Sequence, residues 1–264
     1  MTIDALLPLI AIFCAGLGAG FINVIVGSGT LITFPVLLMF GYPALTANMS
    51  SNLGLIAGNF SGVYGYRREI AHLKPLVKKL LPASLLGGVT GALLLLVLPS
   101  SVFDFAVPIL ILLGIIMVVI SPMVQKRTAA KLKVAGGAGH HDSLAMARPA
   151  LTFLTVAALG LYGGYFGAAQ GVLMVGSLGM LLAVSLQSLN ALKNALVAGV
   201  NVVSAIIFVL FTGDLIDWTV VLLLAAGAAL GGLLGAKVGR SLPPSVLRAV
   251  IVVIGTIALI NMVV

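Results

Sequence analysis

The chain has 264 residues, of which 61% are hydrophobic and 8% are charged. Soluble domains carry about 25% charged residues on a polar surface. The chain has only fourteen Lys and Arg and six Asp and Glu, too few for the surface of a soluble protein, whether secreted, cytosolic or nucleic-acid-binding. The meaning of its net charge of +8 depends on where the cations lie along the chain.

Apolar blocks follow one another along the whole chain. A helix that crosses the hydrocarbon core needs about 20 apolar residues. Such blocks cover residues 4–26, 30–65, 76–97, 102–122, 147–169, 172–212, 217–238 and 245–264. The long blocks 30–65 and 172–212 are each predicted to form a short half-helix followed by a full helix, because only helices satisfy their backbone in lipid. The sequence predicts an all-α integral membrane protein with about 8–10 hydrophobic segments.

The cations indicate which loops share a side of the membrane. Thirteen of the fourteen fall within residues 67–79, 123–148 and 237–248. Cytoplasmic loops are enriched in Lys and Arg, so we expect these segments in the cytoplasm of a multi-pass cell (inner) membrane protein, with both termini outside. Between residue 147 and the outer turn at 213, one full span plus a re-entrant hairpin, or three crossings, satisfies this assignment.

Two parts of the chain resemble each other at a shift of 142 to 144 residues. Equivalent loops differ in charge, since residues 67–79 are basic and 213–217 are acidic, so the parts are expected to have opposite orientations. We predict two inverted repeats, 1–122 and 147–264, joined by a cytoplasmic linker, 123–146. Such repeats are typical of secondary transporters with alternating access at the repeat interface. The recurring residues are Asn48, Asn52 and Asn59 with Asn190, Asn194 and Asn201, and Gly87, Gly88 and Gly91 with Gly231, Gly232 and Gly235.

The repeated asparagines form a polar stripe on each helix, because positions i, i+4 and i+11 share one face. Buried amides need a hydrogen-bonding partner or a polar cavity. We expect the four amides near the helix breaks, Asn48, Asn52, Asn190 and Asn194, to face a substrate. Asn59 and Asn201 form a secondary polar ladder, for which bonding between helices is the alternative role.

Lys193 is the one cation outside the three basic segments, and its apolar block contains no Asp or Glu. An intramembrane lysine is expensive unless it snorkels or pairs. Two interpretations stay open: snorkelling to the outer interface, or a counter-charge for an anionic substrate.

Glycine-containing breaks precede the two half-helices. A helix N-terminus offers free N–H groups and the positive end of a dipole, which suit an anion. The repeated Gly87 and Gly231 motifs are interpreted as packing surfaces. The break residues added to the expected substrate site are Gly27, Ser28, Gly29, Thr30, Gln170 and Gly171.

The polar residues of the spans indicate binding rather than catalysis. The six carboxylates fall at block edges or in loops, Cys14 is the single cysteine, and all three histidines lie in segments expected in the cytoplasm. We therefore expect no enzyme, no catalytic residue, no cofactor and no metal site. The expected partners are a small anion and the lipid bilayer; a homodimer stays open.

These motifs resemble the TauE/SafE sulfite exporter family. The resemblance rests on Gly27-Ser28-Gly29-Thr30-Leu31 with Pro35, on Gly41-Tyr42-Pro43, on the Asn-containing helix, and on a second copy beginning at Gly171. The family's usual triple-Gly form is interrupted here by Ser28 and Thr30, and Ser177 stands where Pro35 stands. The resemblance implies export of sulfite, sulfoacetate or a related organosulfonate. The residues alone indicate a small-anion transporter, with an anion channel or uniporter as the alternative.

Overall fold

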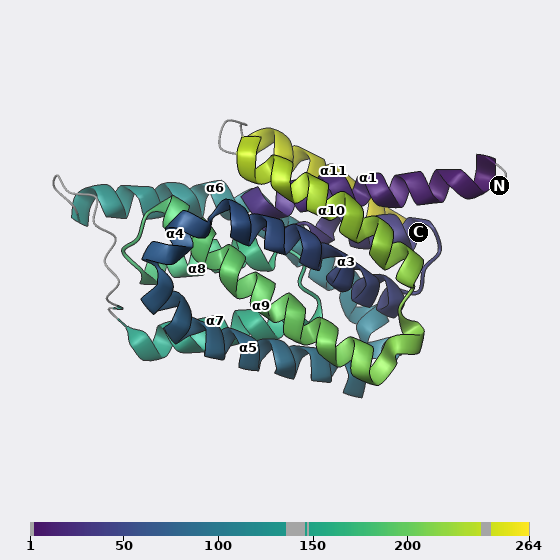
Figure 1. The fold of residues 1–264 in the computed structure, drawn as a ribbon, viewed down its shortest axis with the longest axis horizontal. Helices are drawn as coiled ribbons and strands as arrows, with labels where there is room; N and C mark the ends of the chain where they lie inside the picture. Colours follow the sequence, from purple (N-terminus) through teal and green to yellow (C-terminus); the bar gives the residue numbers. More distant parts are fainter. Residues whose placement is uncertain (1–2, 136–145, 147, 239–243, 264) are drawn as a thin grey trace.

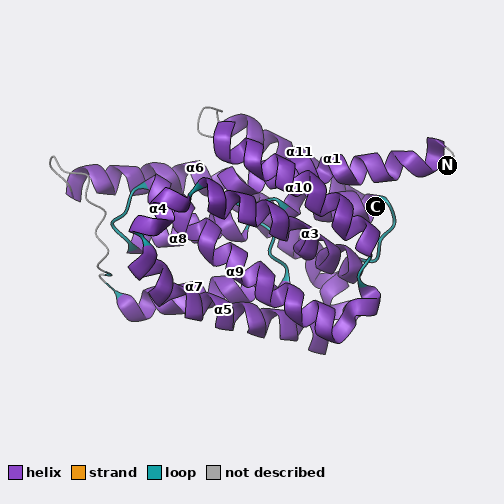
Figure 2. Cartoon of the chain, in the orientation of Figure 1, coloured by secondary structure: helices purple, strands orange, loops and turns teal. Residues whose placement is uncertain are grey.

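The computed structural model describes residues 3–135, 146, 148–238 and 244–263. Over these residues the chain is helical and contains no strand (Figure 2). Among them, five helices are long and apolar enough to cross a membrane: Leu6–Ile25, Lys74–Val97, Ser100–Met123, Leu186–Leu215 and Trp218–Lys237. The chain is therefore the expected all-α integral membrane protein.

Long and short helices alternate in a similar order along the two parts of the chain (Figure 1). The first part contains α1 (Ile3–Ile25), α2 (Thr30–Met39), α3 (Ala44–Gly65), α4 (Arg67–His72), α5 (Lys74–Val97) and α6 (Ser100–Ala135). The second contains α7 (Pro149–Tyr165), α8 (Gln170–Leu181), α9 (Leu186–Thr212), a 3-10 turn (Gly213–Leu215), α10 (Trp218–Val238) and α11 (Pro244–Val263).

Both long apolar blocks consist of a short and a long helix, as predicted. The first block is interrupted at Gly41, which has a φ of +81°. The interruption of the second block, between Leu181 and Leu186, contains no glycine or proline. There the boundary comes from Ser185, whose hydroxyl accepts a hydrogen bond from the N–H of Ser188 and caps α9.

The central segment differs from the expected linker at its start. Helix α6 continues to Ala135, so the first part of the 123–146 segment is helical. Residues 136–145 of the predicted linker, which include His140 and His141, lie outside the described residues, as does Arg240 of the third basic segment.

Two side-chain hydrogen bonds mark the two ends of the bundle. Tyr42, after α2, donates a hydrogen bond to Asp217, before α10; burial and this neighbouring carboxylate raise the pKa of Tyr42. Gln187, at the start of α9, donates to Glu69 of α4. In Figure 1, α4 lies at the left, whereas α1 begins and α11 ends at the right. The α1–α2 hairpin therefore runs inward from one end, and the α7–α8 hairpin from the other.

Each hairpin packs against the opposite part of the chain. Helix α1 lies along α10, and α7 lies along α5 (Figure 1). Glycines make this approach possible: a Cβ on Gly235 would lie 2.7 Å from the carbonyl oxygen of Phe21, and one on Gly91 would overlap that of Leu161. Contacts of this kind agree with the packing role expected for Gly87, Gly88, Gly91, Gly231, Gly232 and Gly235.

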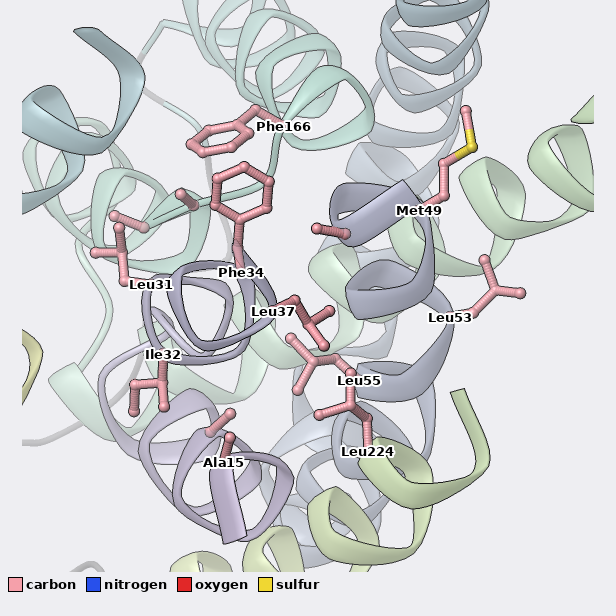
Figure 3. Packing of buried hydrophobic residues seen from close by; sticks show 14 of the residues in the cluster. Ala15, Leu31, Ile32, Phe34, Leu37, Met49, Leu53, Leu55, Phe166 and Leu224 are labelled. Atoms are coloured by element: carbon pink, nitrogen blue, oxygen red, sulfur yellow. The ribbon is translucent and has the colours of Figure 1, made fainter. Parts of the chain in front are cut away.

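Aromatic packing holds the short helix α2 against the end of α7. The ring of Phe34 meets that of Phe166 edge-on, with centroids 5.1 Å apart and an interplanar angle of 86° (Figure 3). Leu31 and Leu37, on the same short helix, are buried in the same apolar cluster. With only ten residues, α2 spans about 15 Å, roughly half of the hydrocarbon thickness.

Candidate functional site

The tips of the two hairpins touch each other. The backbone N–H of Gly171, in the first turn of α8, donates a 3.0 Å hydrogen bond to the carbonyl oxygen of Gly27, which follows α1. A Cβ on Gly27 would lie 2.6 Å from the Cα of Gly171, and the φ of Gly27 is +88°. Two predicted break residues thus form the crossing point, where neither side has room for a side chain.

Lys193 reaches across this point from α9 to the end of α1. Its Nζ donates hydrogen bonds of 3.0 Å to the carbonyl oxygen of Asn23 and 3.1 Å to that of Val24. The side chain is 1% exposed. Snorkelling to an interface is therefore wrong for this residue: the ammonium lies against the negative end of the α1 dipole.

Amides of three helices lie around the same helix end. Asn23 donates from Nδ2 to Oδ1 of Asn59, at 2.6 Å, and its own Oδ1 accepts from the N–H of Gly29 at 3.3 Å. Asn194 and Val24 both pack against Gly62, one turn after Asn59. The Nδ2 atoms of Asn59 and Asn194 are buried and have no hydrogen-bonding partner in the protein. We call Asn23, Asn59, Lys193 and Asn194 the α1 cluster.

Asn23 is a member that sequence reasoning missed. It lies inside the first apolar block, four residues before Gly27, and has no asparagine at the equivalent position of the second part. A lone asparagine in an apolar helix next to a break is a signal that could have identified it, because its amide needs a buried partner.

Neutral amides bond to the carbonyl oxygens of α7, the first helix of the other hairpin. Asn48 donates from Nδ2 to the carbonyl oxygen of Tyr165, the last residue of α7, at 3.1 Å. Gln170 turns back and donates to the carbonyl oxygen of Leu159 at 3.0 Å. The break lies just before the predicted break residues Gln170 and Gly171: positive φ values occur at Gly167 and Ala169, and α8 already begins at Gln170.

The remaining predicted residues differ in burial and pairing. Ser28 is buried with an unpartnered hydroxyl, and Thr30, half-buried, begins α2. Asn52 is half-buried with an unpartnered Oδ1, Asn190 is half-buried, and Asn201 is buried. The structure thus brings Asn59, Lys193 and Asn194 to the end of α1, where Lys193 lies beside Gly27 and Gly171. Asn48 lies at the end of α7 instead.

The α1 cluster combines one ammonium with amide N–H groups. Its unpartnered Nδ2 atoms are hydrogen-bond donors, and the ammonium contributes positive charge; such donors bind oxyanions. Within the described residues, no group of three or more His, Cys, Asp or Glu side chains is placed to hold a metal ion. The arrangement is chemically suited to a small anion.

Comparisons with known proteins extend over nearly the whole chain. The family model described as Sulfite exporter TauE/SafE matches residues 12–262. A "Probable membrane transporter protein" of Haemophilus influenzae is 31% identical over 258 residues, which cover 95% of this chain and 92% of the relative. "Probable membrane transporter protein ORF9" of Sinorhizobium sp is 29% identical over 252 residues, with coverages of 92% and 87%.

A third relative is "Probable membrane transporter protein YfcA" of Escherichia coli strain K12. It is 24% identical over 250 residues, covering 93% of this chain and 86% of the relative. No solved structure matches the chain. Family and relatives identify a multi-pass membrane transporter rather than an enzyme, and the chain belongs to the TauE/SafE sulfite exporter family.

Proposed function

We propose that the chain is a secondary transporter that exports a small anion, namely sulfite, sulfoacetate or a related organosulfonate, across the cell (inner) membrane. The name of its family supports the sulfur-containing substrate. One observation supports an anionic substrate: the buried ammonium of Lys193 shares a cluster with the unpartnered Nδ2 atoms of Asn59 and Asn194.

The chemistry of a sulfonate or sulfite fits these donors. Each ion carries three oxygens, all of which accept hydrogen bonds, and charge-assisted bonds to an ammonium are the stronger ones. In the proposed complex, the amides of Asn59 and Asn194 donate to the substrate and Lys193 supplies the positive charge. The other predicted residues extend the site on the hairpins, at Gly27 to Thr30, Gln170 and Gly171, and on the long helices α3 and α9, at Asn48, Asn52 and Asn190.

Alternating access uses the two hairpins, which enter from opposite ends and touch at Gly27 and Gly171. In this proposal the parts 1–122 and 147–264 are inverted repeats, and substrate binds where they meet. The end that carries α4 faces the cytoplasm, because Arg67 and Arg68 lie there, and both termini lie outside.

Ligand binding to purified protein tests the substrate. A ligand that binds only the folded state raises its stability by about 2.7 kcal/mol at one hundred times its dissociation constant. We expect sulfite or sulfoacetate to raise Tm, and matched carboxylates to raise it less. If none of the sulfur oxyanions shifts Tm, the proposed substrate class is wrong.

Variants test the site. Asn59→Ala and Asn194→Ala are expected to remove the anion-induced shift in Tm. Gln187→Ala, exposed at the start of the same helix as Asn194, is the matched control and should keep it. An unchanged shift in both amide variants would exclude the α1 cluster as the site. Anion accumulation against a gradient in proteoliposomes then distinguishes a secondary transporter from a channel or uniporter.

A further inference from the structure

We propose that the Lys193 ammonium is a tethered cation that takes the place of a free Na⁺ or K⁺ at the C-terminus of α1. Anion binding by the native protein then needs no free monovalent cation. The inference deepens the proposed function and rests on it for the anion; its cation part is testable without any substrate.

The end of α1 is shaped as a cation site. In a continuing helix the N–H of Gly27 would donate to the carbonyl oxygen of Asn23, but it donates to that of Ile22 instead, at 3.3 Å. The oxygens of Asn23 and Val24 are thereby turned to Nζ of Lys193, at 3.0 and 3.1 Å. In transporters with discontinuous helices, such C-terminal carbonyls coordinate Na⁺ or H⁺.

The path of the lysine stem is also built into the fold. Its Cδ lies 3.1 Å from the position of a Cβ on Gly27 and 2.9 Å from that of a Cβ on Gly171. The stem therefore fills the space that the two glycines leave at the crossing of the hairpins. This path brings a charge carried by α9 to a helix end 170 residues away in sequence.

In the described part of the chain, the contact at the other hairpin is neutral. Its helix end, at Tyr165, receives the neutral amide of Asn48. Ser51 occupies the position equivalent to Lys193 at the 142-residue shift, and its hydroxyl is fully buried without a partner. The amine is thus found at the end of α1 and is not a general requirement of a helix break.

Shortening Lys193 should leave the carbonyl oxygens at the end of α1 in need of a free cation. Lys193→Ala removes both the charge and the stem, which leaves two carbonyl oxygens and space for a small cation. Lys193→Met keeps a stem of similar length without charge, so the space stays filled. The two variants separate a vacant cation site from the mere loss of a buried contact.

The experiment measures Tm of purified native protein, Lys193→Ala and Lys193→Met in the gluconate salts of choline, Na⁺, K⁺ and methylammonium, with no substrate anion present. We expect native Tm to be equal in all four salts. Lys193→Ala should have a lower Tm in choline and regain about 3 °C or more in at least one small cation at about ten times its dissociation constant. Lys193→Met should be destabilised equally in all four.

Recovery provides a second readout if Lys193→Ala is too unstable to purify in choline. Its yield as a folded peak in size-exclusion chromatography should then depend on a small cation during extraction. Three results would overturn the inference. Lys193→Ala could have the same Tm, or give the same low yield of folded protein, in all four salts. Alternatively, the Tm of the native protein could be higher in Na⁺ or K⁺ than in choline.

A separate titration keeps the two proposals apart. Native protein is titrated with sulfite as its choline salt and as its sodium salt. Equal shifts in Tm support both proposals, and a shift with the sodium salt alone overturns the tethered cation but not the anion site. The absence of any shift in both salts overturns the proposed substrate and leaves the cation result of Lys193→Ala standing.

Discussion

The hydrogen bond from the N–H of Gly171 to the carbonyl oxygen of Gly27 joins two hairpin tips that enter the molecule from opposite ends. The bond is between main-chain groups, so it depends on close approach rather than on a particular polar side chain. Glycine at both positions is what permits that approach.

Gly27→Ala should destabilise the protein by about 1–3 kcal/mol or more, because the new Cβ would press on the Cα of Gly171 at a positive φ. Thermal unfolding of purified protein measures the effect. Gly18→Ala, in α1, is the control, since a Cβ there meets nothing within 4 Å. Equal Tm values for the two variants would show that the crossing tolerates a methyl group.

Gly231→Ala should separate α1 from α10, because its Cβ would overlap the carbonyl oxygen of Leu17. Backbone cannot move aside as a flexible side chain can, so we expect a loss of about 1–3 kcal/mol or more, or a loss of folded protein. Size-exclusion chromatography after extraction measures the folded fraction. Gly213→Ala, with open space at its Cβ, should behave as the parent does; a normal Gly231→Ala profile would contradict this packing.

Asn23→Ala should cost about 1–3 kcal/mol, since it leaves the N–H of Gly29 and Oδ1 of Asn59 without their shared partner. Asn59→Ala removes one of the same bonds, so the double variant should cost less than the sum. A double-mutant cycle by thermal unfolding gives the coupling, which we expect at about 0.5–3 kcal/mol. Additive effects would mean that the two amides act independently.

Asp217→Ala should cost about 1 kcal/mol through loss of the α10 cap. Its Oδ1 accepts from the N–H groups of Thr219 and Val220, at 2.9 and 3.1 Å. Asp217→Asn keeps an acceptor oxygen and should retain most of the parent's Tm. If the alanine and asparagine variants lose the same amount, the carboxylate acts through its charge, for example on Tyr42, and not as a cap.

Helices and their breaks were largely predictable from the sequence, because long apolar runs in lipid have one secondary structure available to them. The break before Thr30 and the one at Gly41 carry glycine at positive φ, which is a local signal. The boundary between α8 and α9 has no such signal: Ser185 becomes a cap only because the chain turns there. The second break lies closer to Gly167 than predicted. It gave little signal because Ala169, and not a glycine, adopts a left-handed φ of 58° there.

The partner of Lys193 could not be predicted from composition or spacing. Its hydrogen-bonding acceptors are backbone carbonyls, which every residue has, and they become available only where α1 ends. Side chains of its own apolar block offer Lys193 no partner, so the sequence left only an interface or a substrate as interpretations. Asn59 and Asn194 were predictable as polar residues of one helix face, but their meeting with Asn23 depends on the packing of three helices.

The pairing of α1 with α10 has a consequence for how the protein is made. Trp218, which begins α10, is synthesised 193 residues after Ile25, which ends α1. Helix α1 is therefore made well before α10, and its small-residue face is expected to contact lipid until α10 is inserted. The contact of Lys193 with the end of α1 likewise forms only after α9 has been synthesised. The contact between α1 and α10 therefore forms between helices made far apart in time, and the proposed substrate site at the end of α1 is complete only after α9 is in place.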